Sequence, residues 1–284
     1  MIRQWSLNLA LALLIGGLTS VALFRPGLET DQPVTPLTNV NTETIREISV
    51  QRPAQDAILL RKENQYWQLI KPIRARASDF VINEILAVAT AASQIQLPYS
   101  ASEEAGKYGF SNPRAVVQLD QSTITFGDTN SLNQLQYVLH EKQVHMVSAN
   151  LIWSVNRQAN EYIDKRLLEF RQSPQSIQFA DGSRLELVNG NWSVSNSKYN
   201  QPGDSLARLV NEWRSASATR VAPYEQGRAQ GSIRVGYGDG MVIEFDILSL
   251  KPELILMRKD ERLQYHLPGT ASNRLFLVNN STSK

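Results

Sequence analysis

The sequence predicts an α+β protein in which an N-terminal transmembrane helix precedes two tandem repeats of an antiparallel-sheet-plus-helix unit. Three observations support this prediction. Residues 6–24 contain no charged side chain. Many later segments alternate apolar and polar residues, as half-buried strands do. Two sparse features recur 125 residues apart, because Trp67 and Asp79 in the first half correspond to Trp192 and Asp204 in the second.

The composition is that of a globular protein, and it excludes several functional classes. The 284 residues are 42% hydrophobic and 20% charged, which suits one large domain or two of ordinary size. The net charge is only +2 and there is no dense Lys/Arg stripe, so no nucleic-acid partner is expected. The chain has no Cys, which excludes disulfides, thiolate zinc sites and Cys nucleophiles.

The N-terminal segment has the length and composition of a membrane anchor. Residues 1–5 are predicted to form a cytoplasmic tip, with Arg3 favouring a cytoplasmic amino end. Residues 6–24 are long enough, as a helix, to span the hydrocarbon core. A cleaved signal peptide and a buried core helix are the alternatives. Residues 25–44 contain Pro, Thr and Asn without apolar periodicity, which predicts a linker.

The first repeat is assigned to residues 45–172 and consists mainly of short strands. Two strand patterns flank a turn at 62–64, and Pro72 ends the second arm because proline has no N–H to donate. Asp79 is predicted to cap a helix over residues 80–93. The remaining elements are a strand at 45–50, a turn cluster at 106–113, hairpins within 115–128 and 135–148, and a helical segment over 148–170.

The second repeat is assigned to residues 173–278 and is followed by a tail at 279–284. Asp-Gly at 181–182 and Asn-Gly at 189–190 are dipeptides typical of tight hairpins. Asp204 is predicted to cap a second helix. Two further hairpins are expected, with turns at 238–240 and 259–261.

The spacing of these features favours duplication of a single unit. Tyr224 follows Tyr99 by the same 125 residues that separate the Trp and Asp pairs. Chance matching of short strands is the alternative. At this offset the helical face Val81, Ile85 and Val88 falls on Leu206, Val210 and Trp213.

An ordered set of motifs runs along the first half of the chain: Trp67, Leu69 and Pro72; Ala77 and Asp79; Tyr108, Gly109, Phe110 and Pro113; Phe126, Gly127 and Asp128; and Tyr137 with Val138. In order and spacing this set resembles the DUF4340 family, an uncharacterised group of membrane-anchored envelope proteins. Residues 164–170 resemble the closing segment of that family, whereas Phe110 replaces its usual Leu. The second half has no counterpart of the Tyr-Gly-Leu motif.

The resemblance implies an N-terminal anchor, an α+β unit and an auxiliary role. Family members are often encoded beside ABC-transporter components similar to those of gliding motility. The resemblance therefore implies a protein partner in an envelope or ABC-type complex, and a place at the bacterial inner membrane with the C-terminal domains in the periplasm. The family carries no agreed catalytic residues, so none are transferred to this chain.

Few residue patterns point to chemistry, and we predict no catalytic, cofactor-binding or metal-binding residues. His140, His145 and His266 have no compact ligand spacing and are expected at exposed positions or strand edges. Ser195 and Lys198 fit an S-x-x-K pattern, but Pro202 follows closely and the required helical turn is not expected.

Three other patterns have ordinary structural explanations. Residues 236–240, Gly-Tyr-Gly-Asp-Gly, lead into a strand and not a helix, which favours a hairpin turn over a phosphate loop. Helix capping accounts for Asp79 and Asp204, although a pair of carboxylates converging across a cleft stays open. The basic cluster Lys71, Arg74 and Arg76 is expected at the solvated surface, with contact to lipid phosphate or an acidic partner as the alternative.

These observations together favour a non-catalytic accessory or scaffold module. It would be anchored in the inner membrane by one helix and would receive a partner at its sheet edges or between its repeats. The first alternative is an envelope hydrolase acting on glycan or peptide. The second is a glycan- or lipid-binding module with an aromatic-lined groove.

Overall fold

The computed structural model describes residues 12–17, 19–20, 35–100, 105–169, 171–196 and 202–277. The chain divides into two compact units, Met1–Thr35 and Pro36–Lys284. In the first unit, residues 12–17 and 19–20 are helical. Within the described residues, no helix is both long and apolar enough to cross a membrane. Much of the predicted anchor at 6–24, the first part of the predicted linker and the tail at 279–284 lie outside the described residues.

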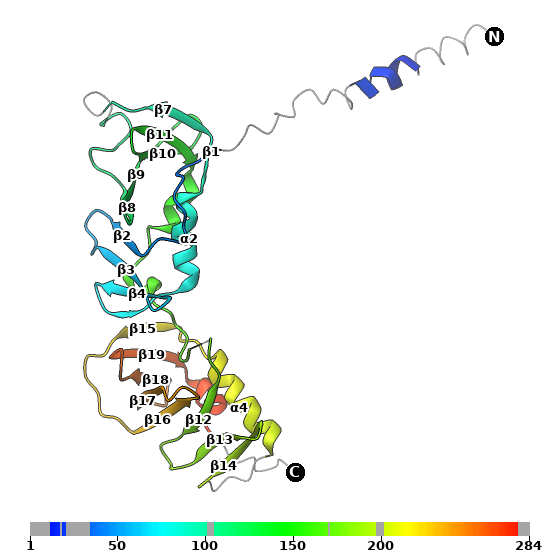
Figure 1. The fold of residues 1–284 in the computed structure, drawn as a ribbon, viewed down its shortest axis with the longest axis vertical. Helices are drawn as coiled ribbons and strands as arrows, with labels where there is room; N and C mark the ends of the chain where they lie inside the picture. The colour runs from blue at the N-terminus through cyan, green and yellow to red at the C-terminus, as the bar shows by residue number, and fades with distance from the viewer. Residues whose placement is uncertain are drawn as a thin grey trace, which may run out of the picture. The chain divides into compact units, whose positions relative to one another are not determined.

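The second unit is built from two antiparallel sheets and a few helices, which confirms the α+β class. The first sheet has nine strands in the order β5-β4-β3-β2-β8-β9-β10-β11-β7, and α2 lies along it (Figure 1). The second sheet has eight strands in the order β14-β13-β12-β16-β17-β18-β19-β15, and α4 lies along it. Strands β1 and β6 form a separate two-stranded sheet.

The strands match the predicted alternating segments closely. The two-stranded sheet consists of β1 (Thr35–Pro36) and β6 (Ala92–Ser93). The first sheet consists of β2 (Glu47–Gln51), β3 (Ile58–Glu63), β4 (Tyr66–Lys71), β5 (Ala75–Arg76), β7 (Ile95–Pro98), β8 (Ala115–Leu119), β9 (Ser122–Thr129), β10 (Leu135–His140) and β11 (Gln143–Ser148). The second consists of β12 (Pro174–Gln178), β13 (Arg184–Val188), β14 (Asn191–Ser195), β15 (Arg220–Pro223), β16 (Gly231–Tyr237), β17 (Val242–Ser249), β18 (Glu253–Arg258) and β19 (Leu263–Pro268).

Tight turns explain why these strands pair as hairpins. Asn189 and Gly190 both have positive φ, 50° and 79°, as a two-residue hairpin turn requires. Between β3 and β4 the turn lies at Asn64 and Gln65, slightly later than predicted, again with positive φ at both residues. The turn at 238–240 joins β16 to β17, which confirms a hairpin there.

The two main helices lie where the apolar patterns predicted them, but the capping prediction was wrong. Helix α2 spans Asp79–Ala89 and α4 spans Gly203–Ser215, and their N-cap residues are Ser78 and Pro202. No side-chain cap hydrogen bond forms at the N-terminus of either helix. Asp79 and Asp204 lie instead in the first turns, where a carboxylate faces the positive end of the helix dipole. Helix α2 ends at Ala89, before Ser93, because the chain then forms β6 and β7.

The segment predicted as helical over 148–170 forms short turns instead. Residues Ala149–Ser154 and Ala159–Tyr162 are the 3-10 helices η1 and η2. The hydroxyl of the buried Tyr162 donates to the carbonyl of Val155 over 3.1 Å, which holds the two turns together. Near the C-terminal end, Gly269–Ala271 is η3 and Ser272–Leu275 is α5.

Each sheet buries the apolar residues of one face beneath its helix. On α2 the buried residues include Ile82 and Ile85, and on α4 they include Leu209 and Trp213. Trp67 is buried, whereas Trp192 is half-buried and packs against the core. The core of the first sheet also contains Ile48, Val50, Leu60, Val117, Ile124 and Phe126, and that of the second Ile177, Leu185, Val235, Phe245, Leu256 and Tyr265.

The two sheets are connected in the same order. Taken from β14 to β15, each strand of the second sheet has a counterpart in the first, from β4 to β7, and β5 alone is extra. In the first sheet α2 follows β4 and the extra strand β5 and precedes the edge strand β7. In the second sheet α4 follows β14 and precedes the edge strand β15. A 3-10 helix follows the last hairpin in both cases, η1 in the first and η3 in the second.

Each sheet is preceded by a segment that pairs with the chain just after its helix. Before the first sheet, Leu37 N–H donates to Ala91 O (2.8 Å). Before the second, Leu167 N–H donates to Ala216 O (3.1 Å). Leu37 and Leu167 are both fully buried. Part of the segment predicted as a linker at 25–44 is therefore packed against the folded unit.

Candidate functional site

The largest group of buried charges in the described chain lies where the two sheets meet. Arg76 ends β5 of the first sheet, Arg258 ends β18 of the second, and Glu169 lies on the segment between them. Glu169 Oε1 is 2.5 Å from Arg76 Nη1 and 3.6 Å from Arg258 Nη2. These three side chains, which we call the junction cluster, are 7%, 5% and 15% exposed for Arg76, Arg258 and Glu169.

Further acids complete the charge balance of the junction cluster. Asp164 Oδ2 lies 3.0 Å from Arg76 Nε, but this contact is an ion pair and not a hydrogen bond, because the N–H geometry is unfavourable. Arg258 Nε donates to Asp260 Oδ1 over 2.9 Å, and its Nη1 lies 3.6 Å from Glu261 Oε1. Each guanidinium therefore faces at least two carboxylates, which offsets the cost of removing it from water.

The pKa shifts at the junction follow from burial and these charges. Burial alone would lower the pKa of Arg76, but Asp164 and Glu169 outweigh it and the pKa is raised. The pKa of Arg258 is raised in the same way, against burial, mainly by Glu261 and Asp260. Burial raises the pKa of Tyr265 well above its usual value. With raised pKa values, Arg76 and Arg258 stay charged and Tyr265 stays neutral over the physiological range, which suits a structural role better than proton transfer.

The connecting segment also bonds to both sheets through its backbone. Asp164 N–H donates to Arg76 O (2.8 Å), while Ala218 N–H donates to Lys165 O (2.8 Å). Glu169 N–H donates to the hydroxyl of Tyr237 on β16 (3.3 Å). The segment is therefore joined to both sheets by backbone bonds as well as by charges.

The prediction that Lys71, Arg74 and Arg76 form a solvated cluster was wrong for Arg76. Lys71 is exposed, and Arg74 is exposed and paired with Glu63 at 2.6 Å. Arg76 points into the junction because the segment after η2, about ninety residues later, brings its partner carboxylates there. Sequence reasoning missed Glu169 and Arg258 as well. Arg258 directly follows the apolar run 254–257, and a charge in such a position is a usable signal, whereas Glu169 lies in a segment already rich in charges.

A second cluster unites motifs that are far apart in the sequence. The backbone of the turn at 108–110 lies against β9, where Asp128 N–H donates to Tyr108 O (2.8 Å). The Tyr108 ring packs on Tyr137 of β10, with centroids 4.8 Å apart, and on Phe110 at 5.9 Å. Three motifs of the family resemblance, Tyr-Gly-Phe, Phe-Gly-Asp and Tyr-Val, therefore meet at one place.

Close backbone approach explains the glycines of these motifs. A Cβ at Gly127 would lie 2.0 Å from Tyr108 O and 2.7 Å from the Phe110 ring. Gly109 has φ +78°, and a Cβ there would lie 2.5 Å from the Asp128 side chain. Both positions leave no space for any larger residue, so these motifs specify packing.

Replacing Gly127 with Ala is expected to reduce the free energy of unfolding by about 1–3 kcal/mol, because the new methyl group overlaps a backbone carbonyl. Urea denaturation of the purified protein measures this loss. Gly106→Ala is the matched control, since a Cβ at Gly106 meets no atom within 4 Å. Similar stabilities of the two variants would show that the turn at 108–110 can move away.

Two of the three histidines are buried, contrary to the expectation of exposed or edge positions. His145 is 5% exposed, and its Nδ1 lies 3.0 Å from Ser93 Oγ. His266 is also 5% exposed, and its Nδ1 lies 3.0 Å from Glu253 Oε2. His140 is half-buried, with Nδ1 3.1 Å from Thr123 O. Among the described residues, no group of three or more His, Asp or Glu side chains is placed to hold a metal ion.

Burial of His145 predicts a loss of stability in weak acid. Burial, followed by the charge on His140, lowers the pKa of His145 below its ordinary value of 6.5. The unfolded chain therefore binds this proton more readily than the folded chain, and stability falls as the pH drops from 6.5 towards the folded pKa. His145→Asn should flatten this part of the pH profile in urea denaturation. An unchanged slope would assign the titration to another group.

The other singled-out residues are not brought together into a reactive arrangement. Ser195 ends β14, and its hydroxyl donates to Arg184 O at 3.5 Å; Lys198 lies outside the described residues. Asp79 lies 3.6 Å from Arg166 Nη2, whereas Asp204 is on the helix of the other sheet. The pair of carboxylates considered from the sequence is therefore split between the two helices.

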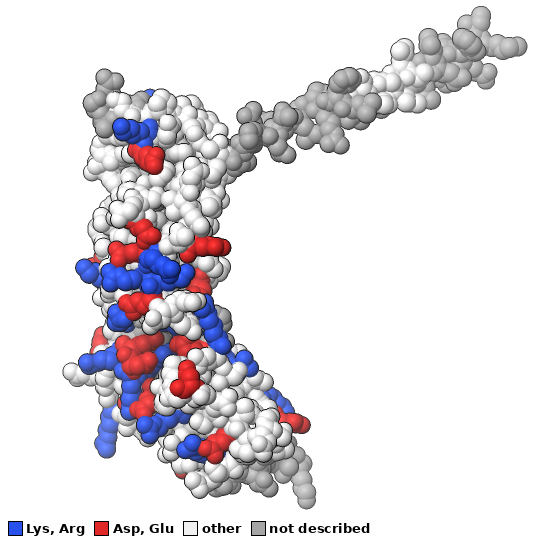
Figure 2. All heavy atoms as spheres, in the orientation of Figure 1, with Lys and Arg blue, Asp and Glu red and all other residues white. Residues whose placement is uncertain are grey.

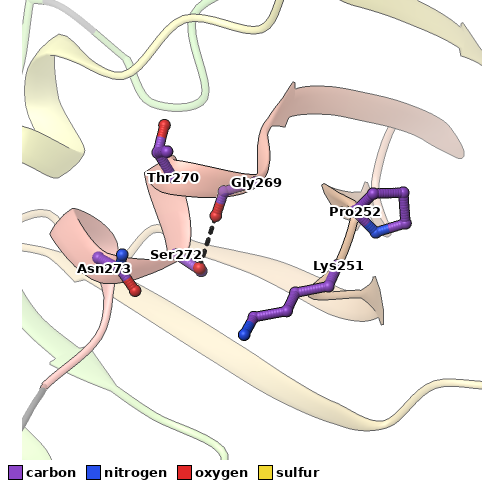
Figure 3. Close-up of a pocket in the computed structure, with 6 residues that line it drawn as sticks. All are labelled: Lys251, Pro252, Gly269, Thr270, Ser272 and Asn273. Carbon is purple, nitrogen blue, oxygen red and sulfur yellow. Dashed lines mark hydrogen bonds between the residues drawn. The ribbon is translucent and has the colours of Figure 1, made fainter.

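The surface hollows differ in how many ionisable groups line them, and the one on α4 is lined by Arg208, Glu212 and Arg214. One of about 660 Å³ lies beside η3, where the labelled residues include Lys251, Thr270 and Asn273 (Figure 3). In the wall of this hollow, Ser272 Oγ donates to Gly269 O over 2.7 Å, so the hydroxyl proton is already used in a hydrogen bond. Lys251 is the one ionisable side chain of the wall, which gives no acid–base pair in this hollow.

The fold and the junction cluster define a class of protein: an α+β unit of two antiparallel sheets joined through buried ion pairs. The chain belongs to the family of the domain of unknown function DUF4340, whose profile matches residues 67–230, more than half of the sequence. This confirms the resemblance in the sequence motifs. The match runs from β4 of the first sheet to the residue before β16, so it includes the connecting segment. No curated protein and no solved structure gave a match.

Proposed function

We propose that this protein is a non-catalytic accessory or scaffold module that docks onto a complex of the cell envelope. The observation that carries the proposal is that the buried charges bind one sheet to the other. The buried ionisable side chains of Arg76, Glu169 and Arg258 form ion pairs with each other, and so join one sheet to the other. Functional sites are often built from such groups, but here carboxylates and guanidinium groups neutralise each other.

We also propose that the two sheets arose by duplication of one unit. The shared strand order, the matching helix position and the leading segments that bury Leu37 and Leu167 support this origin. Within the sheets the 125-residue offset relates β4 to β14 and α2 to α4. A duplicated unit without duplicated site residues suits a supporting role.

The place of action is proposed from the sequence and the family. The uncharged segment at 6–24 would hold the chain in the inner membrane, with both sheets in the periplasm. The host complex would be an ABC-type exporter or extrusion system, in line with the genomic neighbourhood of the family. Docking would use the sheet surfaces: on the face shown in Figure 2, charges of both signs gather over β2–β4 and the second sheet, while the region of β8–β11 is mostly uncharged.

Affinity purification of the full-length chain from detergent-solubilised membranes tests this function. Co-purification of transporter subunits in a fixed ratio is the expected result. The Glu169→Gln chain is the informative comparison, because it weakens the junction cluster without changing a surface residue outside it. A partner-free monomer that hydrolyses peptidoglycan or peptides would overturn the proposal in favour of an envelope hydrolase.

One observation favours a glycan-binding alternative. Trp153 on η1 is 63% exposed, whereas Trp67 and Trp213 are buried and Trp192 packs against a core. An exposed indole face can stack on a sugar ring or lie at a membrane interface. Retention of the wild-type chain, but not of Trp153→Ala, on immobilised envelope glycan would support this alternative.

A further inference from the structure

Arg52 is a buried cation with an unusual set of partners. It follows β2 and begins the loop to β3, which has seven residues between the last paired residues Val50 and Ile58. The corresponding loop of the second sheet has five, between Gln178 and Arg184. The Arg52 side chain is folded under its longer loop, and the residue is only 7% exposed.

The contacts of Arg52 are to carbonyl oxygens and an aromatic ring. Its Nη1 donates to Arg157 O, and its Nη2 donates to Asp56 O over 3.4 Å. The guanidinium carbon lies 6.0 Å from the centre of the Tyr162 ring. The buried Nε has no hydrogen-bond partner in the described chain. No carboxylate of the described residues lies within 4.0 Å of this guanidinium, in contrast to Arg76 and Arg258.

This arrangement leaves the positive charge incompletely compensated. A guanidinium has five N–H groups; two donate to carbonyl oxygens and the Nε–H is buried, which leaves two. Burial of a charge without a counter-charge is unfavourable, whereas paired buried arginines are tolerated. Nearby Arg157 is ion-paired with Glu84, so that carboxylate is already engaged.

Arg52 also lines an open cavity of about 590 Å³. The wall is formed by the β2–β3 loop and by the start of η2, and the exposed Gln55 and Gln158 are at its surface. Asp56 contributes to the same wall. The cavity thus combines one buried cation, neutral amides and a single acid.

We propose that this cavity binds a carboxylate group, held by the two remaining N–H groups of Arg52. Arginine presents a planar fork that matches the two oxygens of a carboxylate. Asp56 in the wall disfavours a doubly charged phosphate relative to a singly charged acid. The site does not depend on the docking role proposed above, because a small acid can occupy it in the isolated protein.

Thermal unfolding of the full-length chain in detergent, with acetate or N-acetylglycine titrated against chloride at constant ionic strength, tests the site. A ligand that binds only the folded chain raises Tm with concentration. We expect both acids to raise Tm and phosphate to do so less. We expect the apparent affinity to fall about tenfold or more in Arg52→Gln.

Gln55→Glu gives a second, milder variant in case Arg52→Gln does not fold. It places a competing carboxylate in the wall while leaving Arg52 in place, so acetate affinity should fall with stability retained. Gln118→Glu on β8 is the matched control, with the same charge change at an exposed position outside the cavity. Equal acetate responses of wild type, Gln55→Glu and Gln118→Glu would overturn the proposal, as would a stronger response to phosphate.

Discussion

Glu169→Gln is expected to lower the free energy of unfolding by about 3–5 kcal/mol, because it removes the charge shared by two buried guanidinium groups. Gln keeps the shape of the side chain but leaves Arg76 and Arg258 facing each other, and the charge on Arg258 already disfavours the charged form of Arg76. Asp164 remains beside Arg76 and limits the loss. Urea denaturation followed by circular dichroism measures the change.

The matched control for this prediction is Glu47→Gln on β2. Glu47 pairs with Arg61 at 2.8 Å, but the two side chains are 45% and 50% exposed. Exposed pairs contribute about 0–1 kcal/mol and are screened by salt. A loss of the same size in both variants would contradict a special role of the junction cluster.

Trp213→Ala is expected to reduce the free energy of unfolding by about 3–5 kcal/mol, because it creates a cavity in the core of the second sheet. Trp213 is fully buried on α4, and its ring centre lies 5.9 Å from that of Phe245 on β17. Its Nε1–H donates to Leu275 O over 2.7 Å, so the substitution also leaves a buried carbonyl without its donor.

Trp153→Ala provides the comparison for the indole itself. Trp153 is 63% exposed, and removal of an exposed side chain changes stability by about 0.5 kcal/mol or less. Trp213→Phe retains most of the volume and should lie between the two alanine variants. A Trp213→Ala protein as stable as Trp153→Ala would mean that the core refills the space.

The hairpins and the two main helices could be predicted because their signals are local. Asn189-Gly190 specifies its turn through positive φ at two adjacent residues, whatever lies elsewhere in the chain. The buried face of α4, with Leu206, Val210 and Trp213, follows from helical spacing alone. These features needed no knowledge of distant partners.

The junction and the histidines could not be predicted because their environments are assembled from distant residues. Arg76 follows two surface cations in the sequence. Its buried ion-pair partner, Glu169, comes from another part of the chain. His145 lies in an alternating strand, and its ring is buried where Ser93 of β6, a strand of another sheet, lies against it. Single-sequence patterns carry no information on which strand covers which neighbour.

The segment 163–169 also shows why apolar periodicity alone can mislead. Ile163, Leu167 and Leu168 are all buried, but in the segment between the sheets and not on one helical face. Ala77 and Ile163 form one isolated β-bridge, and Arg166 and Ser217 form the other. Extended backbone that pairs with two sheets produces the same apolar spacing as a helix would.

The segment that precedes each sheet determines where the chain can be cut to express one sheet with its helix alone. A fragment that starts at Pro174, where the second sheet begins, would omit Leu167 and the backbone bond to Ala216. Without Leu167, the apolar side chains that it covers would be exposed, and the fragment would be prone to aggregate. A fragment that starts at Ile163 would keep Leu167 and its backbone bond to Ala216. The second sheet is therefore best truncated about ten residues before its first strand.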